Sequence, residues 1–113
     1  MSEATEKSME SVFQALASVA RRKILAYLSG GEMTAGEIAE RFAMTKPSIS
    51  KHLSLLEAAG LISGDKRGQY IYYHLVQDSL VNTLNGFVQE VCPVSRPLKK
   101  ESQTRARTKT KSQ

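Results

Sequence analysis

The chain has 113 residues, which suffices for one small domain with short tails. An apolar content of 41% can form a hydrophobic core and argues against wholesale disorder. The net charge of +5 is unevenly distributed: residues 1–92 carry nine basic and ten acidic side chains, net −1, whereas residues 93–113 carry seven basic and one acidic, net +6. The total charge therefore gives no evidence for a basic face on the folded part.

Reactive side chains are too few for most enzymes and most metal sites. Cys92 is the only cysteine, which excludes an internal disulfide and a multi-cysteine zinc site. His52 and His74 are the only histidines, and no spacing of a nucleophile and a base stands out. We therefore expect no catalytic residue, no metal and no cofactor.

Hydropathy and the N-terminal residues favour a cytoplasmic protein without membrane insertion. No apolar run approaches the roughly 20 residues that a membrane span needs. Residues 1–10 are acidic and polar, which is the reverse of a secretory signal.

The first apolar stripe predicts a helix after a short flexible lead-in. Residues 1–8 show no periodicity, whereas apolar side chains from Met9 onward recur every three or four residues. A second helix is expected over residues 20–28, ended by the glycine pair that follows. Basic residues 21–23 occupy its first turn, which is the unfavourable end of the helix dipole for cations, so we expect a compensating anion nearby.

Two further helices are predicted, with a short break between them. Thr34 and Glu37 have the spacing of a capping box, which starts the first of the two. Thr45 is a good N-cap for the second, and Pro47 falls in its first turn, where the missing N–H costs nothing. This second helix continues to Ala59. The expected inward residues are Ile38, Ala39 and Phe42 in one helix and Ile49, Leu53 and Leu56 in the other.

A β-hairpin with a basic tip is expected next, followed by a last helix. Residues 61–64 and 69–75 are rich in β-branched and aromatic side chains, and residues 65–68 have the composition of a turn. Asp78 can cap the last helix, which ends at Cys92. We expect a lead-in over residues 1–8, one folded domain over residues 9–92 and a disordered basic tail over residues 93–113.

Two short helices joined by a tight turn and followed by a hairpin form a winged helix-turn-helix. The expected fold is mainly α with a small β-hairpin, in the order of four helices, two strands and a final helix. The second helix of the pair fits the DNA major groove, and its exposed face carries Ser50, Lys51 and Ser54. The candidate DNA-binding residues are Lys46, Ser48, Ser50, Lys51, His52, Ser54, Lys66, Arg67 and Gln69.

Each of these contacts has a plainer interpretation. Ser50 and Ser54 could simply be exposed to solvent, although serine is a weak helix former. His52 lies nearer the buried edge of its helix, where a hydrogen-bonded structural histidine and a DNA contact explain it equally well. Lys66 and Arg67 could belong to an ordinary solvated turn, but their place at a hairpin tip favours contact with the DNA backbone.

Three segments resemble the bacterial ArsR-type transcriptional repressors: FQALASVARRKIL, MTAGEIAERFAMTKPSISKHLSLLEAAGLI and RGQYIYYHL. Within that family, GGEMTAGEIAE, KPSIS and GQYIYY are most similar to the SdpR-like autorepressor branch. The resemblance covers about residues 9–92 and implies a homodimer that occupies a double-stranded DNA operator, with the first and last helices packed across the two-fold axis. The corresponding dimerisation residues are Phe13, Leu16, Val81, Leu84, Val88 and Val91.

The sequence departs from the metal-sensing relatives. Those carry a Cys-x-Cys motif in the first helix of the pair, where residues 36–41 here hold no thiol. Others place Asp and His ligands on the last helix, where this chain offers Asp78, Asn82, Asn85 and Gln89. Transition metals select imidazole or thiolate. We therefore expect a metal-independent regulator.

The leading interpretation is a sequence-specific DNA-binding repressor that acts on its own promoter among others, cytoplasmic and nucleoid-associated when bound to DNA. One alternative is a protein-interaction module in which an anti-repressor protein controls release from DNA. Another is a thiol-responsive regulator that uses Cys92. A third is a general nucleic-acid coating protein driven by the basic residues of the tail, residues 93–113.

Overall fold

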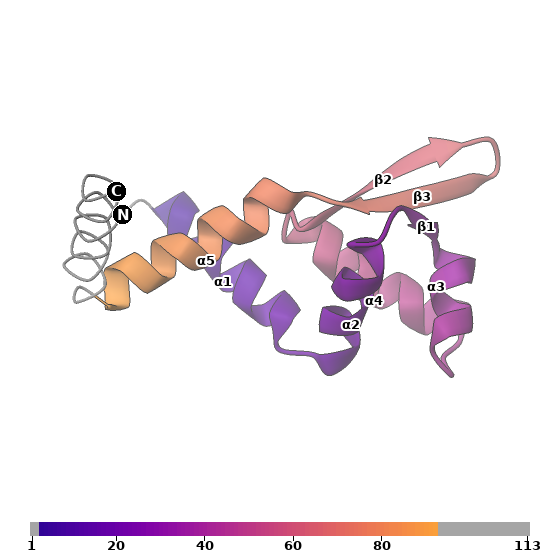
Figure 1. Ribbon diagram of the computed structural model, residues 1–113, viewed down its shortest axis with the longest axis horizontal. Helices are drawn as coiled ribbons and strands as arrows, with labels where there is room; N and C mark the ends of the chain where they lie inside the picture. Colours follow the sequence, from indigo (N-terminus) through magenta and orange to yellow (C-terminus); the bar gives the residue numbers. More distant parts are fainter. Residues whose placement is uncertain (1–2, 93–113) are drawn as a thin grey trace, which may run out of the picture. The chain divides into compact units, whose positions relative to one another are not determined.

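The computed structural model describes residues 3–92 (Figure 1). The chain falls into two compact units, residues 1–81 and residues 82–113, so the domain expected over residues 9–92 spans parts of both. The expected basic tail, residues 93–113, lies outside the described residues. The elements in chain order are α1 (Glu3–Leu16), α2 (Val19–Leu28), β1 (Met33–Thr34), α3 (Ala35–Arg41), α4 (Lys46–Ala58), β2 (Ile62–Arg67), β3 (Tyr70–Leu75) and α5 (Gln77–Val91).

The fold is mainly helical with a small antiparallel sheet, which confirms the expected class. The sheet has three strands in the order β1-β3-β2, so β1 is an element that the sequence analysis did not predict. It pairs with β3 through Met33 opposite Tyr73 and Thr34 opposite Tyr72. A strand of two residues carries no periodicity of its own, and only its partner strand reveals it.

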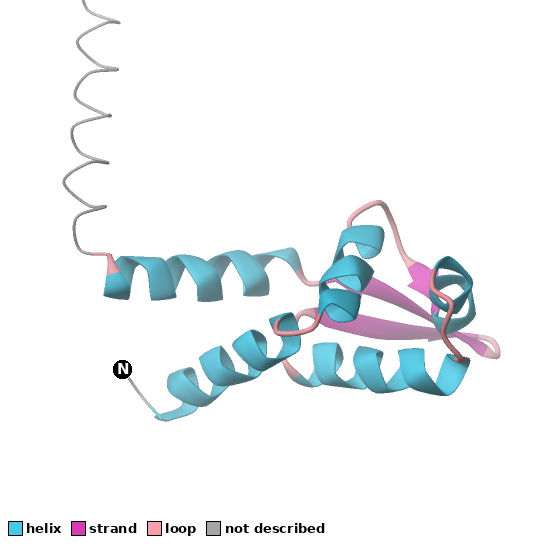
Figure 2. Cartoon of the chain, turned by 90° about the horizontal axis from the view of Figure 1, so that it is seen from below, coloured by secondary structure: helices cyan, strands magenta, loops and turns pink. Residues whose placement is uncertain are grey.

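A single hydrophobic core holds the helices of the first unit against the sheet. Helix α4 contacts α1, α2, α3 and β2, and Figure 2 shows it running alongside the two long strands. All three expected inward residues of α4 are buried, as is Ile38 of α3, whereas Ala39 and Phe42 are half-buried at the edge. The core residues are Val12, Ala15, Ile24, Leu25, Leu28, Ile38, Ile49, Leu53, Leu56, Leu61 and Ile62.

Helix α1 begins at Glu3 rather than at Met9, where the apolar stripe begins. Residues 3–8, expected as a flexible lead-in before the helix, therefore lie within it. Residues 6–8 are polar and exposed, so hydrophobic periodicity could not reveal this part of the helix.

Within residues 6–92, the basic first turn of α2 is compensated by carbonyl oxygens rather than by the expected anion. Arg21 donates through Nε to the carbonyl of Ala15 at 2.7 Å and through Nη2 to the carbonyl of Gln14 at 3.0 Å. Arg22 donates to the carbonyl of Leu16. The last carbonyls of α1 have no partner within their own helix and form the negative end of its dipole. They therefore provide the negative potential for which the sequence suggested a carboxylate.

The predicted capping box at the start of α3 is confirmed. The backbone N–H of Glu37 donates to Thr34 Oγ1 at 3.2 Å, and the backbone N–H of Thr34 donates to Glu37 Oε1 at 3.0 Å. Each bond satisfies a donor that the helix itself cannot satisfy.

Replacing Thr34 by alanine should lower the free energy of unfolding by about 1 kcal/mol, because one backbone donor of α3 loses its partner. Urea denaturation of the purified variant measures the change. Thr34→Ser retains the hydroxyl and is the matched control, expected close to the original protein. A Thr34→Ala variant as stable as Thr34→Ser would contradict the capping role.

The hairpin turn lies further along the chain than expected. Strand β2 continues through Arg67, which pairs with Tyr70, so the turn consists of Gly68 and Gln69 alone. Gly68 has a φ of +62°, a value that side chains disfavour and that a two-residue hairpin turn requires. Asp65 and Lys66, expected in the turn, are strand residues.

Candidate nucleic-acid interface

Helices α3 and α4 form the helix-turn-helix pair, and a capped N-terminus fixes the start of α4. Thr45 is the N-cap: its Oγ1 accepts from the backbone N–H of Ser48 at 3.4 Å and donates to Ser48 Oγ at 3.2 Å. Pro47 lies in the first turn, as predicted. The hydroxyl of Ser48 therefore takes part in the cap while it remains exposed.

The outer face of α4 brings together most of the candidate contacts. Ser50, Lys51 and Ser54 are all exposed, on the side of the helix that turns away from the buried Ile49 and Leu53. Leu55, which is 51% exposed on the same face, was not among the predicted contacts. At about 100° per residue, Leu55 projects beside Lys51 rather than into the core. This helical spacing could have identified Leu55 as an exposed residue from the sequence alone. An exposed leucine in this place can contact a thymine methyl group.

Lys46 lies at the start of α4 and packs against α3. A Cβ added to Gly36 would come within 3.2 Å of Lys46 Cε, so the absence of a side chain at Gly36 leaves room for the lysine chain. The lysine is exposed and has a flexible stem, which allows it to reach a phosphate at the edge of the groove.

His52 takes part in a hydrogen bond within the fold, as expected for the structural one of its two predicted roles. It is half-buried, and its Nδ1 lies 3.2 Å from Nη1 of Arg21. A guanidinium only donates, so Nδ1 is the acceptor in this hydrogen bond. Arg21 therefore joins the last turn of α1 to the middle of α4 and helps to fix the position of the reading helix.

The C-terminal end of α4 is tied to the wing formed by β2 and β3. Glu57 Oε2 accepts the backbone N–H of Gly64 at 3.0 Å. A side chain at Gly64 would come within 2.8 Å of Ile71 Cγ2, so only glycine allows this close approach. Burial and the nearby Glu57 carboxylate raise the pKa of Tyr73 in the same region.

The wing tip is less cationic than the sequence suggests. Arg67 donates through Nη2 to Glu32 Oε2 at 2.9 Å and to Asp65 Oδ2 at 3.2 Å, and through Nη1 to Glu32 Oε1. Its guanidinium carbon lies 4.9 Å from the centre of the Tyr72 ring. Arg67, Glu32 and Asp65 together carry a formal charge of −1. Lys66 and Gln69 are exposed at the tip.

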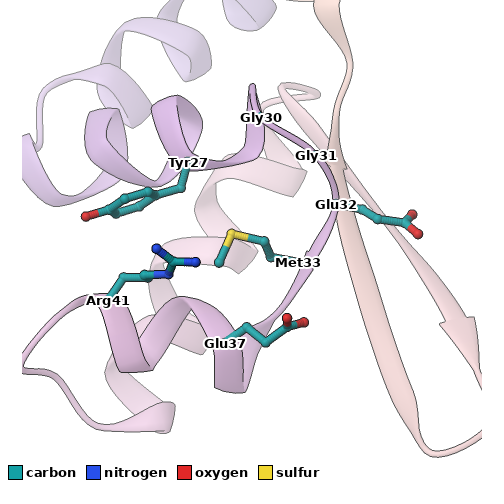
Figure 3. A pocket seen from close by; sticks show the side chains of 7 residues that line it. All are labelled: Tyr27, Gly30, Gly31, Glu32, Met33, Glu37 and Arg41. Atoms are coloured by element: carbon teal, nitrogen blue, oxygen red, sulfur yellow. The ribbon is translucent and has the colours of Figure 1, made fainter.

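A shallow pocket of about 360 Å³ lies beside α3, lined by Tyr27, Met33, Glu37 and Arg41 among others (Figure 3). The guanidinium of Arg41 lies 5.8 Å from the centre of the Tyr27 ring, a cation–π contact that fixes one side of the pocket. Figure 3 shows the carboxylate of Glu32 directed away from Tyr27 and Arg41. Glu32 also lines this pocket, and its carboxylate is the group that pairs with Arg67 of the wing.

The residues assigned to dimerisation lie on α1 and α5. Phe13 and Leu16 of α1 are half-buried. None of the described residues of α5 is buried, and its apolar stripe includes Val81, Val88 and Val91, which are 64%, 46% and 56% exposed; Leu84 is half-buried. Cys92 is exposed at the end of this stripe.

Residues 3–92 contain no group of three or more His, Cys, Asp or Glu side chains that could hold a metal ion. Within the same part of the chain, no helix has both the length and the apolar character required to cross a membrane.

Known proteins share this architecture. Residues 16–65 match the model of a helix-turn-helix domain family. The transcriptional repressor SdpR of Bacillus subtilis (strain 168) is 51% identical over 77 residues, which cover 68% of this chain and 86% of SdpR. The transcriptional regulator CmtR of Mycobacterium tuberculosis (strain ATCC 25618 / H37Rv) is 32% identical over 92 residues, covering 81% of this chain and 78% of CmtR.

Two solved structures share both the fold and the sequence pattern. The crystal structure of an ArsR family transcriptional regulator superposes with a TM-score of 0.73 at 30% identity, covering 80% of this chain and 93% of that chain. An ArsR-like transcriptional regulator from Rhodococcus sp. RHA1 gives the same TM-score and identity over 88% and 94% of the two chains. With its helix-turn-helix pair, its wing and these relatives, the chain belongs to the ArsR family of winged helix-turn-helix transcriptional regulators and is a DNA-binding repressor rather than an enzyme.

Proposed function

We propose that this repressor binds a two-fold DNA operator as a homodimer and that one of its targets is its own promoter. The observation that carries the proposal is the outer face of α4, where short hydroxyls and one cation are exposed on a helix whose other face is fully buried. Such a face can approach base edges closely while the core fixes its orientation. The similarity to SdpR, which is named a transcriptional repressor, supports the same function.

The candidate contacts divide into three roles. Ser50, Lys51 and Ser54 face the base edges, and Leu55 adds an apolar contact. Lys46 and Ser48 lie at the helix start, where backbone N–H groups and a cation favour a phosphate. Residues 66, 67 and 69 at the wing tip approach the backbone of the adjacent groove. His52 supports α4 through Arg21 and has no direct part in reading.

Dimerisation would cover the apolar stripe of α5, which the chain itself leaves exposed. Contact with the same helix and with α1 of a second subunit buries this stripe in an isologous interface. The interface residues are the dimerisation residues of α1 and α5 named above. The functional domain then covers residues 9–92. A two-fold operator with half-sites about one helical turn apart matches such a dimer.

The other interpretations gain no support from the relatives. None of the observations on the described residues identifies an anti-repressor protein that controls release, and Cys92 alone provides no second thiol for an internal pair. We propose that release from DNA does not depend on a metal. The contribution of the basic residues 93–113 to affinity remains a prediction from composition.

Sequencing of DNA crosslinked to the protein in cells tests the proposed function and supplies the operator. The purified protein is then titrated against that duplex and against a random duplex at several salt concentrations. We expect the operator to bind about 10³-fold more tightly or better at physiological salt. Equal affinities with equal salt slopes would show a general coating protein instead.

A further inference from the structure

The wing arginine is already occupied by two carboxylates. Glu32 accepts from both terminal nitrogens of Arg67, and Asp65 accepts a second bond from Nη2. One face of the guanidinium is also covered by the ring of Tyr72. The terminal N–H groups through which an arginine binds a phosphate in forked geometry are therefore largely engaged.

Glu32 reaches Arg67 from a distant part of the chain. It lies in the segment between α2 and β1, 35 positions before Arg67. Its carboxylate points away from Tyr27 and Arg41, which line the pocket beside α3 (Figure 3). The pairing of β1 with β3 brings this segment to the wing, since Thr34 lies opposite Tyr72 and Glu32 directly precedes the strand. The short strand β1 thus has a function: it places a carboxylate at the wing.

The ion pair is suited to exchange rather than to stability. The side chains of Arg67 and Glu32 are 50% and 38% exposed. Ion pairs with this exposure add little to the stability of a fold. The hydrogen bonds that Arg67 donates to Glu32, and next the one to Asp65, raise the pKa of Arg67 above its ordinary value, so the arginine remains charged at any physiological pH.

We propose that Glu32 is an intramolecular competitor of DNA, which must release Arg67 before the wing can bind a backbone phosphate, and that it thereby limits the affinity of the repressor. This inference rests on the wing contact proposed above. In the free protein Glu32 takes the place of the phosphate. On binding, Arg67 exchanges the Glu32 carboxylate for a DNA phosphate. Arg67 therefore adds less to the free energy of DNA binding than an unpaired arginine would.

Glu32→Gln tests this competition because it keeps the size of the side chain and removes its charge. The variant should bind both operator and random DNA more tightly, by about two- to fivefold per protomer, the range that exposed ion pairs span. It should also steepen the dependence of log affinity on log salt by up to about 0.9 per protomer, since Arg67, no longer neutralised by Glu32, then adds one net positive charge that releases DNA counterions on binding. Its thermal unfolding should be unchanged.

Two further variants separate the possible outcomes. Glu40→Gln removes an exposed carboxylate from α3 and controls for the general loss of negative charge. When each is combined with Arg67→Ala, Glu32→Gln should bind DNA no more tightly than Glu40→Gln. An equal gain from Glu32→Gln with and without Arg67, or a loss of affinity in Glu32→Gln alone, would overturn the competition. If Arg67→Ala itself leaves DNA affinity unchanged, the wing contact of the proposed function fails, and the role of Glu32 fails with it.

Discussion

Val88→Glu should convert the repressor into a monomer that no longer binds its operator tightly. Val88 is 46% exposed in the single chain, so a carboxylate there is hydrated and costs the isolated fold little. In the proposed dimer the same carboxylate would be taken out of water among apolar side chains, which is strongly unfavourable. The monomer loses the second half-site, and its affinity for a two-fold operator should fall by about 10²-fold or more.

Sedimentation of the purified variant gives its mass, and titration of the operator gives its affinity. Asn82→Glu is the matched control, because it adds the same charge to an exposed position about 120° around α5 from Val88. We expect this control to remain dimeric. A dimeric Val88→Glu variant at the same concentration would place the interface elsewhere.

Lys51→Ala and Ser50→Ala should change which operator sequences are preferred. If each side chain contacts a base, its loss costs about 1–3 kcal/mol on the matching base pair and little on a mismatched one. The predicted result is a loss of discrimination at one position of each half-site. Binding to a set of single-base operator mutants measures it.

Lys23→Ala is the control for the loss of a positive charge, because Lys23 is exposed on α2 and away from the outer face of α4. Lys23→Ala should lower the affinity for all operator sequences slightly and by the same factor. A Lys51→Ala variant that also weakened every operator mutant by one common factor would make Lys51 a phosphate contact without a role in reading the sequence.

The parts of the fold that depend on local signals could be predicted from the sequence. The inward residues of α4 follow from apolar spacing, and the caps at Thr34 and Thr45 follow from short-range hydrogen bonding within one turn. The hairpin was expected, but its turn was placed too early because Asp65 and Lys66 have turn composition. The pairing of Arg67 with Tyr70 extends the strand against that local preference.

The contacts that complete the candidate site depend on long-range pairing, which one sequence does not reveal. Arg67 and Glu32 are 35 positions apart, and Arg21 and His52 are 31 positions apart. Each pair meets only because the core brings distant segments together. The wing therefore looks cationic in the sequence and is nearly neutral in the folded chain, and the hydrogen bond between Arg21 and His52 has no local sequence signal.

Hydroxyl-radical footprinting combined with guanine methylation interference on the operator tests the central claim most directly, namely that two copies of α4 read a two-fold site in the major groove. We predict two symmetric protected regions with interfering guanines about 10–10.5 base pairs apart, centre to centre. Uniform protection of operator and flanking DNA, without interfering guanines, would contradict it.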